Sequence, residues 1–332
     1  MNPISMSLSS STPKYRQIVA SIEESISKGL LKKGDKLPSL NEIRNKYKLS
    51  RETVITAFKE LKSRGIIHSV VGKGYYVASE NVAISKKIFL LFDEFNSFKE
   101  DIYNSFLANL PANTQVDIFF HHFNPKVFRN LILDSLGNYN FYVIMPANVK
   151  NPLAVIKNLP KDIVYILDQV PEELSGYASI YQNFHDDIFN GLSEGLSKIK
   201  KYSELIFLYD KETQPTGILR GFESFCHLNK LKNKVIKTLD GLTPKEGELY
   251  IILDDKNLIR IIKKIRNEQF VLSKNIGVIS YNETMLKEIV EKGITTISTD
   301  FNLMGSTLAK IVINNEQVKI QNPSRLILRK SI

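Results

Sequence analysis

Apolar residues in the first 80 positions recur at the spacing of short amphipathic helices. They predict a helix over residues 14–28, which Gly29 ends, and its apolar stripe is Tyr15, Ile18, Val19, Ile22 and Ile26. Ser39 is a candidate cap for a second helix over residues 40–47, because Glu42 follows three residues later and completes a capping box. Ser50 is placed to cap a third helix, whose apolar stripe is Val54, Ala57, Phe58 and Leu61.

Two short apolar runs follow the third helix and predict a β-hairpin. The strands are expected over residues 66–71 and 75–77, with Lys73 between two glycines at the turn. The order helix, helix, turn, helix, hairpin is that of a winged helix-turn-helix. Its third helix is thin enough to enter the DNA major groove with its N-terminal residues facing the base edges. We expect this domain over residues 13–78, after a flexible N-terminus of residues 1–12.

The remaining chain alternates apolar strands with amphipathic helices. This alternation over residues 86–332 predicts an α/β fold with parallel sheets in two lobes, joined to the first domain by a linker of residues 79–85. Ligands of such sheets bind outside the carboxyl ends of the strands. Polar residues follow most of the expected strands, although Asp and Asn also end strands simply as turn formers. Carboxylates, amides and aromatic rings are groups that bind sugars, so the expected ligand is a small polar molecule.

The charge is concentrated in the first quarter of the chain. Lys and Arg total 45 against 35 Asp and Glu, a net charge of +10. The first 80 residues hold 14 of these cations and 7 acids, and so carry seven of the ten excess charges. A basic module of this kind is typical of nucleic-acid binding, because Lys and Arg displace counterions from phosphates.

Several other classes of protein do not fit the sequence. Cys226 is the single cysteine, which excludes a disulfide framework or a cysteine-based metal cluster. The run His185, Asp186, Asp187 more plausibly opens a helix than binds a metal. The chain has no glycine-rich phosphate loop and no Gly-x-Ser-x-Gly elbow, so we expect no cofactor, no metal and no catalytic residue. Without a run of 18 apolar residues, we expect a cytoplasmic protein and no membrane partner.

The first domain resembles the DNA-binding domain of GntR-family transcription factors. The resemblance lies in Leu-Pro-Ser at 37–39, Leu-Ser-Arg-Glu-Thr-Val at 49–54 and Gly-Lys-Gly-Tyr-Tyr-Val at 72–77. It implies operator binding by a dimer. The family often has Arg at the positions of Asn41 and Ile55, which implies a different operator sequence. The candidate DNA-binding residues are Ser39, Asn41, Ser50, Arg51, Thr53, Thr56, Lys73 and Gly74.

The second part resembles LacI-type sensor domains, which share the periplasmic sugar-binding-protein fold. The resemblance lies in residues 276–283, 294–300 and 304–305. It implies a sugar effector and a dimer interface along the first lobe. The family's effector-binding Arg falls at Ile218, and Arg220 is the candidate to replace it. The candidate effector-binding residues are Asp93, Phe95, Asn96, Asn148, Gln182, Asp187, Arg220, Asp254, Asn282 and Glu283.

These observations favour a ligand-responsive, dimeric transcriptional regulator. The expected partners are a double-stranded DNA operator and a monosaccharide effector, and the expected action is repression of carbohydrate-utilisation genes that the sugar relieves. One alternative is a DNA-binding dimer whose α/β domain binds a non-sugar metabolite or no ligand. Another is a carbohydrate-acting enzyme with Asp254 and Asp255 as a carboxylate pair, although neighbours at one strand end diverge.

Overall fold

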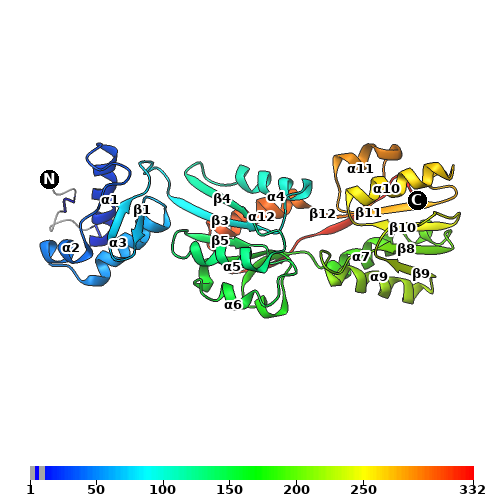
Figure 1. Ribbon diagram of the computed structural model, residues 1–332, viewed down its shortest axis with the longest axis horizontal. Coiled ribbons are helices and arrows are strands. Elements are labelled where there is room, and N and C mark those ends of the chain that lie inside the picture. The colour runs from blue at the N-terminus through cyan, green and yellow to red at the C-terminus, as the bar shows by residue number, and fades with distance from the viewer. Residues whose placement is uncertain (1–3, 7–11) are drawn as a thin grey trace. The chain divides into compact units, whose positions relative to one another are not determined.

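The computed structural model describes residues 4–6 and 12–332, so most of the segment expected to be flexible lies outside the described residues. The N-terminal part folds as three helices and a hairpin (Figure 1). Its elements are α1 (Lys14–Ser27), α2 (Leu40–Tyr47), α3 (Arg51–Ser63), β1 (Ile67–Val70) and β2 (Gly74–Val77). The apolar stripes predicted from the sequence form one core, in which Ile22, Val54 and Phe58 are almost fully buried. Ile4 also packs into this core.

Two six-stranded sheets make up the remainder of the chain. The first has the strand order β13-β7-β6-β5-β3-β4. Its strands are β3 (Lys86–Phe92), β4 (Thr114–Phe120), β5 (Phe141–Ile144), β6 (Val164–Asp168), β7 (Ala178–Tyr181) and β13 (Lys319–Gln321). The helices of this region are α4 (Ser97–Ala108), α5 (Pro125–Asp134), α6 (Leu153–Ile156) and α12 (Phe301–Ile313), with 3-10 turns at Lys161–Ile163 and Glu172–Leu174.

The second sheet has the order β14-β12-β11-β10-β8-β9. Its strands are β8 (Glu204–Leu208), β9 (Asn233–Ile236), β10 (Glu248–Ile252), β11 (Gly277–Tyr281), β12 (Thr295–Thr299) and β14 (Ser324–Ile327). Its helices are α7 (Phe184–Glu194), α8 (Leu196–Ile199), α9 (Thr216–Asn229), α10 (Asp255–Asn267) and α11 (Met285–Ile289), which a 3-10 turn at Val290–Lys292 follows.

Strand β10 shows why this sheet is apolar on both faces. Leu249 and Ile251 belong to the core cluster that contains Phe222 of α9. Tyr250 and Ile252 alternate with them and belong to a second cluster, which contains side chains of α10. Helices α7 and α9 therefore cover one face of the sheet and α10 covers the other (Figure 1). Residues 249–252 of β10 are therefore buried from both faces of the sheet, as is usual for a strand in a sheet that helices cover on both sides.

The predicted fold class, an α/β protein with an N-terminal winged helix-turn-helix, is confirmed. Two short strands were not predicted. β13 extends the first sheet, and β14 pairs with β12 in antiparallel orientation at the edge of an otherwise parallel sheet. Only three and four residues long, they lie on either side of Pro323 and are too short to show a period in the sequence.

The chain divides into two compact units, each made of segments distant in sequence. The first contains Met1–Phe92, Leu110–Ile144 and Asn151–Tyr165, and so holds the winged helix-turn-helix with β3, β4 and β5. The second contains Asp93–Asn109, Met145–Lys150 and Ile166–Ile332. All candidate DNA-binding residues lie in the first unit, and all candidate effector-binding residues lie in the second.

Candidate functional site

Helix α3 begins with a cap that leaves its first residue exposed. The Ser50 hydroxyl accepts a hydrogen bond from the Thr53 backbone N–H at 3.1 Å, and the two hydroxyl oxygens lie 2.8 Å apart. The Thr56 hydroxyl donates to the Glu52 carbonyl at 2.9 Å. Arg51 is exposed. The Ser50 and Thr53 hydroxyls therefore stabilise the helix end, while Arg51 presents a guanidinium group beside the positive end of the helix dipole.

The hairpin between β1 and β2 holds Lys73 at an exposed tip. Gly72 has φ +72° and Gly74 has φ +112°, values that residues with a Cβ rarely adopt. The Lys73 backbone N–H donates to the Val70 carbonyl at 3.0 Å and closes the turn. The two glycines are therefore required by the turn geometry, and Lys73 is the residue that the turn presents.

Helix α2 is fixed by the capping box that the sequence predicted. Ser39 Oγ accepts from the Glu42 backbone N–H at 3.2 Å, and Glu42 Oε2 accepts from the Ser39 backbone N–H at 2.6 Å. These hydrogen bonds lower the pKa of the Glu42 carboxyl. Asn41 is exposed within the first turn of α2. An open hollow of about 1000 Å³ lies beside this helix, and its lining includes Ser39, Lys46 and Lys73.

Asp93, directly after β3, forms a buried ion pair with Lys99 in the first turn of α4. Both side chains are almost completely shielded from solvent. Burial lowers the pKa of Lys99 to about 8, against the opposing negative charge of Asp168. Lys99 is therefore still mostly protonated at neutral pH. Asn96 caps the same helix, because its Oδ1 accepts from the Lys99 backbone N–H at 3.2 Å.

A group of polar side chains surrounds Asp168 at the end of β6. Gln182 Nε2 donates a hydrogen bond to the Asp168 carboxylate. Asp187, in the first turn of α7, is buried, and burial together with the charges of Asp186 and Asp168 raises its pKa to about 7. Burial and the charges of Asp187 and Asp168 raise the pKa of Tyr281, which lies at the end of β11. We call Asp93, Lys99, Asp168, Gln182, Asp187 and Tyr281 the polar cluster.

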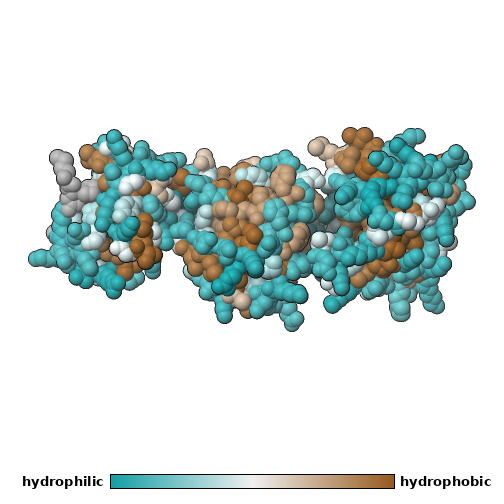
Figure 2. Space-filling model, viewed as in Figure 1, coloured by the Kyte–Doolittle hydropathy of each residue, from teal (hydrophilic) through white to brown (hydrophobic). Residues whose placement is uncertain are grey.

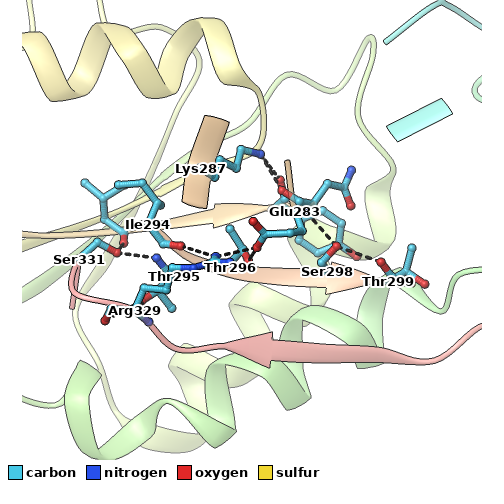
Figure 3. A network of polar contacts seen from close by, with 12 residues as sticks. Glu283, Lys287, Ile294, Thr295, Thr296, Ser298, Thr299, Arg329 and Ser331 are labelled. Atoms are coloured by element: carbon cyan, nitrogen blue, oxygen red, sulfur yellow. Dashed lines mark hydrogen bonds and ion pairs between the residues drawn. The ribbon is translucent and has the colours of Figure 1, made fainter. Parts of the chain in front are cut away.

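The backbone beside the polar cluster is held by a second buried lysine. Lys287, labelled in Figure 3, donates from Nζ to the carbonyls of Tyr281 and Asn282 at 2.8 and 2.7 Å. The same atom lies 3.1 Å from Asp255 Oδ1. Burial lowers the pKa of Lys287. Asn282 has φ +61°, in the left-handed region that Asn tolerates better than most residues. Lys287 thus stabilises the turn that carries Asn282.

Glu283 is tied to the C-terminal segment of the chain. Its Oε2 accepts from the Thr296 hydroxyl and from Arg329 Nη1, the latter at 2.7 Å (Figure 3). Arg329 also donates to the Ile294 carbonyl at 3.0 Å. The Ser331 hydroxyl accepts from the Thr295 backbone N–H at 2.7 Å. Glu283 therefore has a structural role in joining β12 to the segment after β14.

The other predicted effector-binding residues are not in the polar cluster. Asp254 caps α10 by accepting from the Asn257 backbone N–H at 2.8 Å. The Asn148 side chain is within 3.5 Å of the Gln169 amide. Phe95 is 67% exposed, and Arg220 lies exposed on α9. The effector-binding assignment of these residues stays a prediction.

The sequence analysis did not single out Lys99, Lys287 or Asp168. Lys99 and Lys287 each lie in a helix that follows a strand end, where a lysine is normally taken to be exposed. In the printed sequence, the apolar and polar pattern around them gives no signal of burial. Only the packing of α4 and α11 shows that these two lysines are inside the protein.

Residues 4–6 and 12–332 contain no group of three His, Cys, Asp or Glu residues arranged to hold a metal ion. In the same part of the chain, none of the helices combines the length and the apolar character needed to span a bilayer.

The fold and the two sets of residues define a winged helix-turn-helix joined to an α/β part with two sheets. Residues 14–77 match the family model described as "Bacterial regulatory proteins, gntR family". The transcriptional repressor YtrA of Bacillus subtilis (strain 168) is 46% identical over 72 residues, which cover 22% of this chain and 55% of YtrA. The mannosyl-D-glycerate transport/metabolism system repressor MngR of Escherichia coli (strain K12) is 41% identical over 70 residues, 21% of this chain and 29% of MngR.

Solved structures match the larger part of the chain. A transcription regulator-like protein from Staphylococcus haemolyticus aligns with a TM-score of 0.62 and 13% identity, over 74% of this chain and 98% of its own. The lac repressor dimer bound to operator aligns with a TM-score of 0.60 and 15% identity, over 74% of this chain and 93% of its own. A LacI-family regulator from Enterococcus faecium with bound ribose aligns with a TM-score of 0.59 and 14% identity, over 74% of this chain and 98% of its own.

The chain therefore carries a GntR-type helix-turn-helix at its N-terminus, followed by an α/β fold like that of LacI-family regulators. The matched segment spans about half the length of YtrA and less than a third of MngR. The relatives thus bear on the DNA-binding part alone, and the structural neighbours show the fold alone.

Proposed function

We propose that this protein is a ligand-responsive transcriptional regulator that represses carbohydrate-utilisation genes and is released from DNA by a sugar. In this proposal residues 13–78 bind the operator, residues 79–85 are the linker, and residues 86–332 bind the effector and dimerise. The observation that carries the proposal is the match of residues 14–77 to the GntR model, in a chain whose remaining fold is like that of LacI-family regulators. As a DNA-binding regulator it would act in the cytoplasm.

The DNA-binding role rests on the exposed residues of α3 and the wing. Arg51 at the start of α3 is placed to reach a guanine edge or a phosphate, which its planar guanidinium binds in a bidentate manner. Lys73 at the hairpin tip is placed to contact the phosphate backbone beside it. Asn41, Thr56 and the backbone of Gly74 complete the proposed surface, while Ser39 and Ser50 fix the two helix starts.

The sugar-sensing role rests on polar side chains at strand ends, where parallel sheets bind their ligands. Asp93, Gln182, Asp187 and Asn282 supply carboxylate and amide groups there. Two of the similar proteins are connected with sugars. MngR is the repressor of a mannosyl-D-glycerate transport/metabolism system, and the Enterococcus faecium regulator was solved with bound ribose. A sugar that favours one of two conformations of the α/β part would shift DNA affinity by its differential binding free energy.

A homodimer is part of this proposal, because two winged domains are needed to read two operator half-sites. Helix α11 offers an apolar surface for it beside the second sheet, and not along the first lobe, where the resemblance implied the interface. This helix buries Lys287 and exposes Met285 and Ile289, which are 84% and 78% exposed. Figure 2 shows the resulting apolar patch over α11. The lac repressor that shares the fold is described as a dimer.

We also propose that the protein is not an enzyme. The carboxylate pair that the sequence offered for catalysis, Asp254 and Asp255, has structural partners. Asp254 caps α10, and Asp255 forms an ion pair with the buried Lys287. Two carboxylates used in this way are poorly placed for paired acid and base work.

The proposal is tested by selecting binding sites from a random duplex library with the purified protein, and then screening a panel of monosaccharides. The expected results are an enriched two-fold repeated motif and at least one sugar that raises the melting temperature and weakens binding to the selected duplex. No enriched motif would contradict the DNA-binding role. A motif without any responding sugar would contradict the sensing role.

A further inference from the structure

The polar cluster contains buried side-chain atoms that have no hydrogen-bond partner among the described residues. They are Oδ2 of Asp187, Oε1 of Gln182 and the hydroxyl of Tyr281. These three side chains are only 6%, 6% and 3% exposed. A buried polar atom without a partner costs about 1–3 kcal/mol, so several of them in one cluster call for an explanation, and a bound ligand supplies one.

The unpaired atoms are mainly hydrogen-bond acceptors. Gln182 Nε2 already donates to Asp168, which leaves Gln182 Oε1 as an acceptor only. An ionised Asp187 carboxylate also only accepts. Oδ1 of Asn282, at the end of the same strand as Tyr281, is a further acceptor without a partner in the described part of the chain. The missing ligand groups are therefore donors.

The charges of the cluster are also unbalanced. Among the described residues, Asp93, Asp168 and Asp187 supply three carboxylates to the polar cluster, and Lys99, which forms an ion pair with Asp93, supplies one ammonium group. Burial raises the pKa of both Asp168 and Asp187. Lys99 and the Gln182 hydrogen bond oppose this shift at Asp168, whereas no cation or donor in the described part of the protein opposes it at Asp187. Within residues 4–6 and 12–332, no three His, Cys, Asp or Glu side chains are arranged to hold a metal ion.

We propose that the effector is a small polyol that carries a protonated amine, of the amino-sugar class. Its ammonium group binds between the carboxylates of Asp168 and Asp187, and its hydroxyl groups donate to Gln182 Oε1 and bond with Tyr281. This inference rests on the proposed function and narrows its ligand class. A neutral sugar would leave the excess negative charge of the cluster in place, and a sugar acid or phosphate would add charge of the same sign.

Matched pairs of sugars test this proposal with the full-length protein. D-glucosamine, D-galactosamine and D-mannosamine are compared with D-glucose, D-galactose and D-mannose, by thermal shift and by calorimetric titration at neutral pH. N-acetyl-D-glucosamine serves as an amide without charge. We expect one amino sugar to bind at least about tenfold more tightly than its neutral partner, because hydrogen bonds to charged groups are stronger.

The variant Asp187→Asn tests the role of the cluster. It should reduce the affinity for the amino sugar to about that of the neutral sugar, since one of the two carboxylates is removed. Glu194→Gln is the control, because Glu194 is exposed on the same helix and the same charge is removed. The melting temperatures and DNA affinities of both variants without sugar establish that they are folded.

Several results would overturn the proposal. These are a neutral sugar that binds as tightly as its amino partner, no binding by any of the three amino sugars, or an amino-sugar preference that Asp187→Asn retains. The proposed function is tested separately, by measuring whether a sugar releases the protein from DNA. If a neutral sugar releases the DNA, the amine proposal is wrong and the sugar-sensing function stands. If an amino sugar binds without changing the DNA affinity, the amine proposal stands and the sugar-sensing function is wrong.

Discussion

Arg51 is the residue on which DNA recognition depends most directly in this account. It is the first residue of α3, exposed, and in the part of the helix that faces base edges in a winged helix-turn-helix. Arg51→Ala should lower the affinity for a selected operator duplex about 5- to 150-fold, the effect of losing about 1–3 kcal/mol of contact energy. Fluorescence anisotropy at fixed salt measures this change.

The control for Arg51→Ala is Lys59→Ala, an exposed cation near the other end of the same helix. It should change the affinity much less, although it removes the same charge. Equal losses in the two variants would mean that Arg51 acts only through net charge, and an unchanged affinity in Arg51→Ala would exclude its recognition role.

The raised pKa of Asp187 predicts that the free energy of unfolding depends on pH. Its pKa rises from 3.8 to about 7 on folding, mainly through burial and then through the charges of Asp186 and Asp168, with Tyr281 also facing it. The folded state therefore keeps a proton that the unfolded state releases, so this group's contribution to stability falls as pH rises between about 4 and about 7. Above that range its contribution is constant.

Asp187→Asn should remove this contribution. The difference in unfolding free energy between the variant and the wild type should increase with pH up to about 7 and then level off. Urea titrations over this pH range measure it, with Glu194→Gln as the variant that should show no such trend. A difference that does not vary with pH would show that Asp187 titrates normally in the folded protein.

At the scale of elements, Arg64 connects the winged domain to the segment that follows it. Its side chain is 12% exposed at the C-terminal end of α3. Nε donates to the Ile84 carbonyl at 2.8 Å, and the guanidinium pairs with Glu23 of α1. In the same compact unit, the Asn140 amide donates to the Ser63 hydroxyl at 3.0 Å. Arg64 therefore binds two carbonyls, those of Val82 and Ile84, in residues 79–85, the segment that the sequence alone indicated as a linker.

Arg64→Met should loosen this connection while keeping the apolar stem of the side chain. Hydrogen exchange of the amides of residues 79–85 should become faster, and the stability of the winged domain should fall by about 1–3 kcal/mol. Lys59→Met on the same helix is the control and should change neither quantity. Unchanged exchange in Arg64→Met would show that other contacts order this segment.

Elements with a clear period were predictable from the sequence, and elements defined by long-range contacts were not. The limits of α2 follow from its capping box, and the structure has this helix over the residues where the sequence placed it. β13 and β14 depend on strands more than 20 residues away, so no local pattern reveals them. The buried lysines Lys99 and Lys287 were missed for the same reason, because only α4 and α11 packing defines their surroundings.

At the scale of the whole molecule, the apolar face of α11 predicts self-association. A short helix that exposes Met285 and Ile289 while it buries Lys287 inverts the usual amphipathic pattern. The double variant Met285→Glu/Ile289→Glu should convert a dimer to a monomer, as measured by light scattering. Leu228→Glu, at a singly exposed apolar residue of α9, is the control that should remain dimeric. A double variant that stays dimeric would place the interface elsewhere.

The central claim is that a small ligand of the α/β part controls DNA binding by the winged domain. The most direct measurement is the affinity of the full-length protein for its selected duplex, with and without the sugar that raises its melting temperature most. A coupling free energy of about 1–3 kcal/mol predicts an affinity that differs about 5- to 150-fold between the two conditions. The same affinity in both conditions, at a sugar concentration that saturates the protein, would contradict the claim.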